Sequence, residues 1–315
     1  MPSPTKFGAL QVDSLIAPQV TETSGKVFYV SNVTTAAALA PGAIGGSNGN
    51  DGLSPQRPFS TIDYAVGQCS ASRGDVIYPL PGHVETVTAA AGLDLDVNGI
   101  SIIGIGSGAL KPRVNFTTAV GADMDVDAAN ITVRNILFTG GIDALTGPLD
   151  INAADCKLID CEWRDVTGQA TDVIVTDATA DRLLIQNYRH DGATAAGTNA
   201  GIAIVGGDGI VIDGLRMDGN FAVGGIDIRT TATTDLEVRN VVFRTRNAAD
   251  IFLIDTITAS TGMIGPNIYI RLQDNAANIT EAITGATFVV FDDVYVVNAA
   301  NEKAMLINWT ASTDA

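Results

Sequence analysis

Aspartate side chains recur at one position of a repeated sequence pattern, and they are the strongest candidates for chemistry in this chain. Asp94, Asp125 and Asp150 each stand between two apolar residues expected to point inward, so their carboxylates should face outward on successive turns of the chain. Like charges stacked about 5 Å apart repel, so either water and salt screen them or a cation such as Ca²⁺ binds between them. Further polar residues follow two positions later: Asp96, Asp127 and Asn152.

The calcium interpretation competes with a simpler one, in which an exposed acidic face keeps the protein in solution. Proton abstraction in a calcium-dependent lyase also needs a basic residue, and the next outward positions of this column are expected to be Ile174 and Ala203. A glycosidase needs two carboxylates in a groove lined by sugar-stacking aromatic rings. Aromatic residues make up only 6% of the chain, and Trp163 falls at an inward position. We therefore expect no catalytic residue and no resident cofactor, with Ca²⁺ as the one candidate ion.

The remaining residues that could take part in catalysis or metal binding are better explained by core packing or by turns. His190 occupies a column of large apolar residues, and no nucleophile accompanies His83 in any motif. Cys156 and Cys161 both point inward in one turn, and a zinc site would need two more ligands. The glycine-rich residues 45–52 lack the Lys-Ser/Thr of a phosphate loop and the glutamate of a calcium loop.

The elements that position these side chains follow from an internal repeat of about 26 residues. Related segments begin at residues 131, 156, 183, 210 and 236, in steps of 25, 27, 27 and 26 residues. Within each segment, apolar and polar positions alternate as in a β-strand. A second set of inward pairs precedes the segments, and it includes Leu93/Leu95, Met124/Val126, Leu149/Ile151 and Val173/Val175.

The fifth position of each segment predicts a sharp, buried bend, because Asn, Asp and Gly tolerate left-handed backbone. Short strands repeated every 26 residues and stacked turn on turn predict an all-β protein, a parallel β-helix of about eight coils. The bend residues should then stack and hydrogen-bond along the rod: Asn135, Asp160, Asn187, Gly214 and Asn240.

The segment before the repeats predicts a helix that caps the open end of the first coil. Ser60 and Asp63 resemble a capping box, and the apolar residues after them share one helix face. We expect this cap at residues 59–70, within a β-helix domain spanning 26–298. Residues 1–25 are expected to form an anchoring arm, and residues 299–315 a C-terminal tail.

The cap and the coils together resemble the pectin-lyase-like superfamily of right-handed parallel β-helices. The resemblance is carried by Asn50-Asp-Gly, Pro58-Phe-Ser-Thr-Ile62, Gly74-Asp-Val-Ile77 and Pro81-Gly-His-Val-Glu85, and by the asparagine ladder. It covers roughly residues 27–298 and implies a right-handed fold. It does not imply one function, because this scaffold serves lyases, hydrolases, adhesins and phage tailspikes.

Composition narrows the classes of partner. The 35 acidic and 18 basic side chains give a net charge of −17, which should repel nucleic acid, anionic lipid and polyuronate. No apolar run is long enough to cross a membrane, and the first residues lack the pattern of a signal peptide. We expect synthesis in a host cytoplasm, and the resemblance, which includes phage tailspikes, implies location in a virion.

The function that we expect is therefore a non-catalytic structural or attachment protein of a bacteriophage virion: a capsid decoration, head fibre or spike component. The alternatives are a polysaccharide-degrading lyase or glycosidase and a bacterial surface adhesin. The expected partners are other capsid or tail proteins and a host surface glycan. Apolar side chains in both terminal segments predict a homotrimer, since exposed apolar runs are normally buried against a partner.

Overall fold

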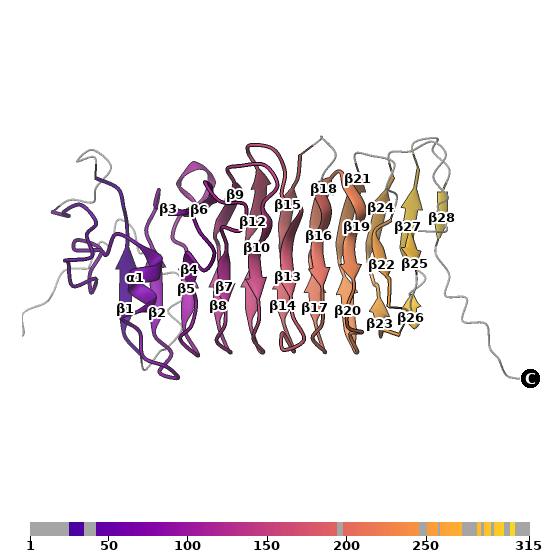
Figure 1. The fold of residues 1–315 in the computed structure, drawn as a ribbon, viewed down its shortest axis with the longest axis horizontal. Coiled ribbons are helices and arrows are strands. Elements are labelled where there is room, and N and C mark those ends of the chain that lie inside the picture. Colours follow the sequence, from indigo (N-terminus) through magenta and orange to yellow (C-terminus); the bar gives the residue numbers. More distant parts are fainter. Residues whose placement is uncertain are drawn as a thin grey trace, which may run out of the picture.

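The structure is a computed structural model that describes residues 25–34, 42–193, 198–245, 251–257, 259–272, 282–284, 287–290, 293–298 and 303–305. Short strands follow one another around a common core, and each turn places its strands beside the equivalent strands of the turn before. About eight such turns of ~26 residues stack into an elongated rod (Figure 1). The predicted parallel β-helix architecture is confirmed.

Sheet A runs along one side of the rod and contains ten strands, all paired in parallel. In spatial order these strands are β1 (Val27–Val30), β2 (Val76–Pro79), β5 (Ser101–Ile103), β8 (Thr132–Arg134), β11 (Lys157–Ile159), β14 (Leu184–Gln186), β17 (Val211–Asp213), β20 (Leu236–Arg239), β23 (Thr261–Ile264) and β26 (Thr287–Val290).

Sheet B follows sheet A in each turn and also contains ten strands. Its last strand, β28, pairs antiparallel with β27, so part of the predicted C-terminal tail belongs to the sheet. In spatial order the strands are β3 (Val84–Val87), β6 (Arg113–Phe116), β9 (Leu137–Gly140), β12 (Glu162–Asp165), β15 (Arg189–Asp191), β18 (Arg216–Gly219), β21 (Val241–Thr245), β24 (Ile268–Arg271), β27 (Val294–Val297) and β28 (Lys303–Met305).

Sheet C completes each turn with eight parallel strands. Its strands are β4 (Leu93–Asp94), β7 (Met124–Val126), β10 (Thr146–Ile151), β13 (Asp172–Thr176), β16 (Thr198–Ile204), β19 (Phe221–Ile228), β22 (Leu253–Asp255) and β25 (Ile283–Thr284).

The three sheets enclose a core formed by the columns that the sequence assigns to the interior. Trp163 and Phe138 are fully buried, and both rings lie near Phe116, at 6.2 Å for Phe138 and 6.1 Å for Trp163. Cys156 and Cys161 are buried free thiols, as expected from their inward positions. His190 is 1% exposed in the same column, and burial lowers its pKa to about 3, so the imidazole is neutral.

The helix before the repeats is shorter than the sequence predicts. α1 spans Ile62–Val66, and its N-cap is Thr61, whose hydroxyl accepts a hydrogen bond from the Tyr64 N–H at 3.2 Å. The expected N-cap, Ser60, instead donates to the side chain of Asn48. Ile62 packs into the core, but a five-residue helix does not establish the cap predicted for residues 59–70. That role remains a prediction, as does the right-handed sense of the coil.

A buried polar pair joins α1 to the first strands. His83 is fully buried and its Nε2 lies 2.8 Å from the Glu85 carboxylate, which also accepts the backbone N–H of Ile62 at 3.0 Å. The other ring nitrogen, Nδ1, accepts the N–H of Asn32, so the proton of a neutral ring sits on Nε2 and points to Glu85. His83 thus has a structural role that no motif in the sequence reveals.

The bend between sheets A and B stacks as predicted. All five residues have positive φ, from 52° at Asn187 to 78° at Gly214. The amide of Asn187 donates to Asp160 at 3.1 Å, and a β-carbon on Gly214 would lie only 2.6 Å from Asn187 Oδ1. The sequence predicts a buried bend, but the Asn187 side chain is exposed, so the left-handed backbone and the ladder hydrogen bonds define the bend.

A second left-handed bend, between sheets C and A, was not predicted from the sequence. Its residues have φ between 56° and 67°, and the backbone N–H groups of the first four donate to the next turn. Most are residue types that tolerate this conformation, but Arg182 is not. The second bend comprises Asn130, Asp155, Arg182, Gly209 and Asp235.

One sequence assignment in sheet C is wrong. The sequence places Val173 and Val175 inward with Ile174 facing out, whereas Ile174 is fully buried and pairs with Leu149. Val175 is the outward residue and pairs with Asp150. The cause is a register shift between Thr146 and Leu149, because one extra residue exchanges the two faces of a strand.

Replacing Asn187 by Leu should lower the free energy of unfolding by about 1–2 kcal/mol, because most residues with a β-carbon are strained in left-handed backbone. The variant also loses the hydrogen bond to Asp160. Urea unfolding measures the change. Asn187→Gly is the matched control and should stay within a few tenths of a kcal/mol of the unchanged protein. Equal stability of the Leu variant would contradict the proposed strain.

Candidate functional site

Sheet C carries the acidic column formed by Asp94, Asp125 and Asp150. Register pairing places Asp94 beside Asp125 and Asp125 beside Asp150, on the neighbouring strands β4, β7 and β10. The structure therefore brings together the three aspartates that the sequence singled out. Beyond Asp150 the column continues through the uncharged Val175 and Ala203.

Asp125 has the most strongly altered acidity within the acidic column. Burial, followed by the neighbouring carboxylates of Asp127 and Asp150, raises the pKa of Asp125 to about 7. The amide of Asn152 opposes this effect by donating to Asp125 Oδ1 at 2.9 Å. Burial is also the main cause that raises the pKa of Asp94 and of Asp150. A carboxyl group that holds its proton near neutral pH is able to act as a general acid.

The column offers less support for a cation. Among the residues that the structure describes, no group of three or more His, Cys, Asp or Glu side chains is arranged to hold a metal ion. The expectation that Asp94, Asp125 and Asp150 share calcium remains a sequence-based prediction.

The outer face of sheet C also carries a charged cluster that was not predicted from the sequence. Arg229 lies between two buried carboxylates, 2.9 Å from Asp172 Oδ2 and 3.2 Å from Asp227 Oδ2. Asp227 is in register with Ala203, so it stands in the same outward column as Asp150, three turns further on. Arg229 is thus a basic residue on the same sheet, and it is paired with Asp172 and Asp227, not with Asp94, Asp125 or Asp150.

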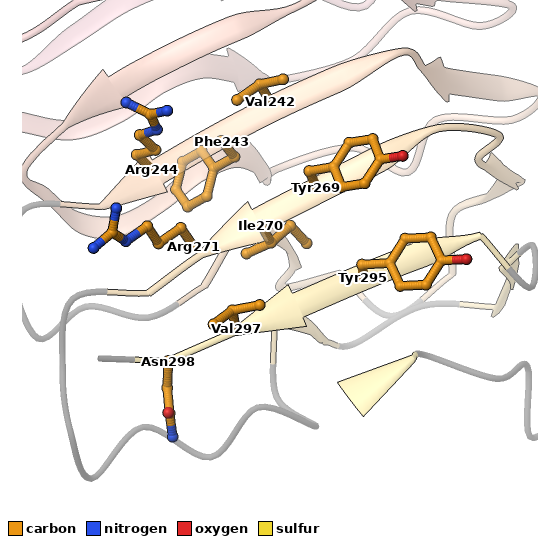
Figure 2. A pocket seen from close by; sticks show the side chains of 9 residues that line it. All are labelled: Val242, Phe243, Arg244, Tyr269, Ile270, Arg271, Tyr295, Val297 and Asn298. Atoms are coloured by element: carbon orange, nitrogen blue, oxygen red, sulfur yellow. The ribbon is translucent and has the colours of Figure 1, made fainter. Parts of the chain in front are cut away.

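The outer face of sheet B carries a different surface near the C-terminal end of the described rod. Tyr269 and Tyr295, here called the tyrosine pair, are in register on β24 and β27 and are 53% and 41% exposed. Their ring centroids lie 5.6 Å apart with planes only 14° from parallel. Figure 2 shows the two rings turned the same way, with both hydroxyls pointing to the same side.

Two arginines accompany these rings. Arg244 and Arg271, here called the arginine pair, are exposed and in register on β21 and β24. They lie towards the other end of sheet B's strands from the tyrosine rings, and Arg271 shares β24 with Tyr269 (Figure 2). Together the two pairs border a shallow pocket of about 430 Å³. Val242 is in register with Tyr269, and Val297 is in register with Arg271, so the two valines extend the tyrosine and arginine columns. The repeat in the sequence does not reveal this site, because β24 and β27 are weak copies of the repeated segment.

The described residues include no helix long and apolar enough to cross a membrane.

No family model matches the chain, and no curated protein matches it. Among solved structures the chain resembles a rhamnogalacturonan lyase, with 12% identity over 90% of both chains and a TM-score of 0.49. That likeness concerns only the course of the chain. It assigns no reaction or substrate to this protein.

The comparison does correct one expectation. The sequence led us to expect a protein that is not an enzyme, whereas the solved structure with the similar fold belongs to an enzyme. We therefore no longer assume that the chain lacks catalytic activity.

The raised pKa of Asp125 should make stability depend on pH. An ordinary aspartate titrates near 3.8, so between about pH 4 and 7 the folded protein retains a proton that the unfolded chain has lost. The contribution of Asp125 is therefore fully present below pH 4 and is lost as the pH rises through 7. Asp125→Asn cannot ionise, and it should raise the melting temperature by roughly 1–3 °C at pH 8 but not at pH 4.

The matched control is Asp51→Asn, because Asp51 is exposed and pairs with Arg57 far from the acidic column. It should show no gain at pH 8. Differential scanning calorimetry at both pH values measures the effect, and an equal response of Asp125→Asn at the two values would contradict the assignment.

Proposed function

We propose that the protein is an attachment protein of a bacteriophage virion, a capsid decoration, head fibre or spike component, and that it binds surface polysaccharide on sheet B. The tyrosine pair is the observation that supports the binding role. Nearly parallel, half-exposed rings on adjacent turns are costly to leave in water, and exposed apolar patches commonly serve as binding surfaces.

Sugars suit this surface better than a purely apolar ligand. An aromatic ring offers a flat apolar face to the C–H side of a pyranose, while the tyrosine hydroxyls offer hydrogen bonds. The pocket beside the rings has both characters, since Val242 and Val297 accompany Arg244 and Arg271. A ligand on this face would contact groups from three successive turns.

The rod itself supports an attachment role. Both tyrosines belong to strands that are paired on each side, so their backbone positions are fixed before a ligand arrives. Preorganisation of this kind reduces the entropy lost on binding. A solenoid also repeats the same outward positions turn after turn, which suits a ligand that is itself a repeating chain.

Cleavage of polysaccharide is a second candidate function, and the acidic column favours it. Asp125 holds a proton near neutral pH, and Asp127 and Asp150 lie close enough to raise its pKa. Glycoside hydrolysis uses two carboxyl groups, one of which acts as a general acid, and Asp125 has the raised pKa that such an acid needs. The cluster of Arg229, Asp172 and Asp227 lies on the same sheet.

The homotrimer remains part of the proposal, and light scattering of the full-length chain would test it. Its sequence support lies largely in residues 1–24, which are outside the described residues.

Removing the tyrosine pair should weaken polysaccharide binding. The variant Tyr269→Ala/Tyr295→Ala should bind bacterial surface polysaccharide at least about tenfold more weakly, because the stacking surface is lost. Affinity electrophoresis in gels containing the polysaccharide measures this. Tyr29→Ala is the control, since Tyr29 also pairs with a tyrosine of the next turn, Tyr78, with centroids 5.8 Å apart and planes tilted by 34°, at the opposite end of the rod. Equal retardation of both variants would refute the assignment.

The enzymatic candidate has a separate test. If the acidic column cleaves polysaccharide, the purified protein should release reducing or unsaturated ends, and Asp125→Asn should lower the rate at least about a hundredfold by removing the general acid. Asp51→Asn again serves as the control. Release at an unchanged rate by Asp125→Asn would exclude this column, and no release by the unaltered protein would leave the attachment role alone.

A further inference from the structure

We propose that the sheet-B face selects an acidic glycan, one whose sugars carry carboxylates, and that the arginine pair supplies this selectivity. The inference rests on the proposed polysaccharide-binding function and adds the chemical class of the ligand. It also runs against the net charge of −17, which by itself predicts repulsion of polyuronates.

Arginines are concentrated on the outer face of sheet B. Outward positions on sheet B hold six arginines, which is one third of the 18 basic residues in the chain. The same positions hold three carboxylates, those of Glu162, Asp191 and Asp218. The acidic column lies on sheet C, on another side of the same rod. Sheet B is therefore locally basic on an acidic protein. The arginines are Arg113, Arg164, Arg189, Arg216, Arg244 and Arg271.

The second step is that the arginine pair is available to a ligand. Elsewhere on this face, Glu162 lies 2.8 Å from Arg164 and 3.6 Å from Arg189, so these charges are partly satisfied within the protein. Within the described part of the chain, neither Arg244 nor Arg271 forms an ion pair or a side-chain hydrogen bond. An exposed guanidinium without a carboxylate partner is suited to bind a carboxylate from outside, through two parallel N–H donors.

The third step is the geometry that joins the two pairs. Tyr269 and Arg271 belong to one strand and point to the same face, because they are two positions apart along an alternating strand. The next turn repeats the tyrosine, and the preceding turn repeats the arginine. The face thus offers a ring surface and a cationic edge along the rod axis, with a repeat of about 4.8 Å.

A glycan chain laid along the axis matches both features at once. Its pyranose rings would cover the tyrosine pair, and carboxylates on one edge of the chain would reach the arginine pair. A neutral glycan would use only the rings and leave both guanidinium groups with water. A nucleic acid would bring a denser line of negative charge than a glycan with carboxylates on one edge, so the carboxylates of Asp191 and Asp218 on the same face would repel it more strongly than the glycan.

The experiment compares acidic oligosaccharides with neutral copies of themselves. Oligomers of mannuronate, guluronate, glucuronate and galacturonate are each paired with the carboxyl-reduced form, and binding to the full-length protein is measured by isothermal titration calorimetry. We expect at least one acidic oligomer to bind about tenfold or more tightly than its reduced form, with affinity that falls as salt rises. Arg244→Gln/Arg271→Gln should abolish this preference and leave binding of the reduced form unchanged.

Arg182→Gln is the matched control, because Arg182 is an exposed arginine on a bend away from sheet B. It should retain the preference. Equal binding of acidic and reduced oligomers that still requires the tyrosine pair would overturn the acidic class while keeping the attachment function. No binding of any oligosaccharide would overturn both. Equally tight binding of oligothymidylate, lost in the arginine double variant, would show a general polyanion surface and also overturn the proposal.

Discussion

In-register parallel pairing is the constraint on which the rest of this structure depends. Each residue of one turn lies beside its equivalent in the next, at the ~4.8 Å spacing of hydrogen-bonded strands. A side chain is therefore placed next to a copy of its own position, whatever its chemistry. Apolar columns gain from this arrangement, because they pack into a continuous core. Charged columns must resolve the repulsion, and Asp125 does so by retaining a proton close to neutral pH.

The same constraint separates charge by face. An outward side chain keeps to one sheet from turn to turn, so the acidic column on sheet C and the arginine-rich face on sheet B stay on different sides of the rod. Net charge describes neither surface. A ligand that approaches sheet B meets Arg244, Arg271 and two tyrosine rings, and the acidic column points in another direction. Since interactions of exposed charges are screened within about 10 Å at moderate salt, the local face governs what binds there.

Polar groups inside the rod are handled in two ways. His190 is simply neutral, since burial lowers its pKa and the ring packs 5.4 Å from Phe221. His83 is instead held by specific partners, with Asn32 on one nitrogen and Glu85 on the other. The first solution suits the uniform middle of the rod. His83 lies where the repeats begin and α1 packs against them. There, specific hydrogen bonds hold the chain in place, as stacking between equivalent residues does in the middle of the rod.

The sequence alone determined the architecture and most of the core, because the 26-residue repeat places the same residue types at the same positions. It located the bend of Asn135 to Asn240, and it aligned Asp94, Asp125 and Asp150 correctly. It failed where the repeat is interrupted: a shifted register in β10 exchanged Ile174 and Val175, and Arg182 occupies a left-handed bend with no matching signal.

Only the tertiary structure decided which charges share a face. Arg229 forms a hydrogen bond with Asp172, which is 57 residues away in the sequence. Tyr295 and Arg244 line the same pocket although they belong to strands two turns apart. Periodicity identifies which residues point outward, but the neighbours of an outward residue depend on register. Register is set by hydrogen bonds between turns, and a single inserted residue changes it.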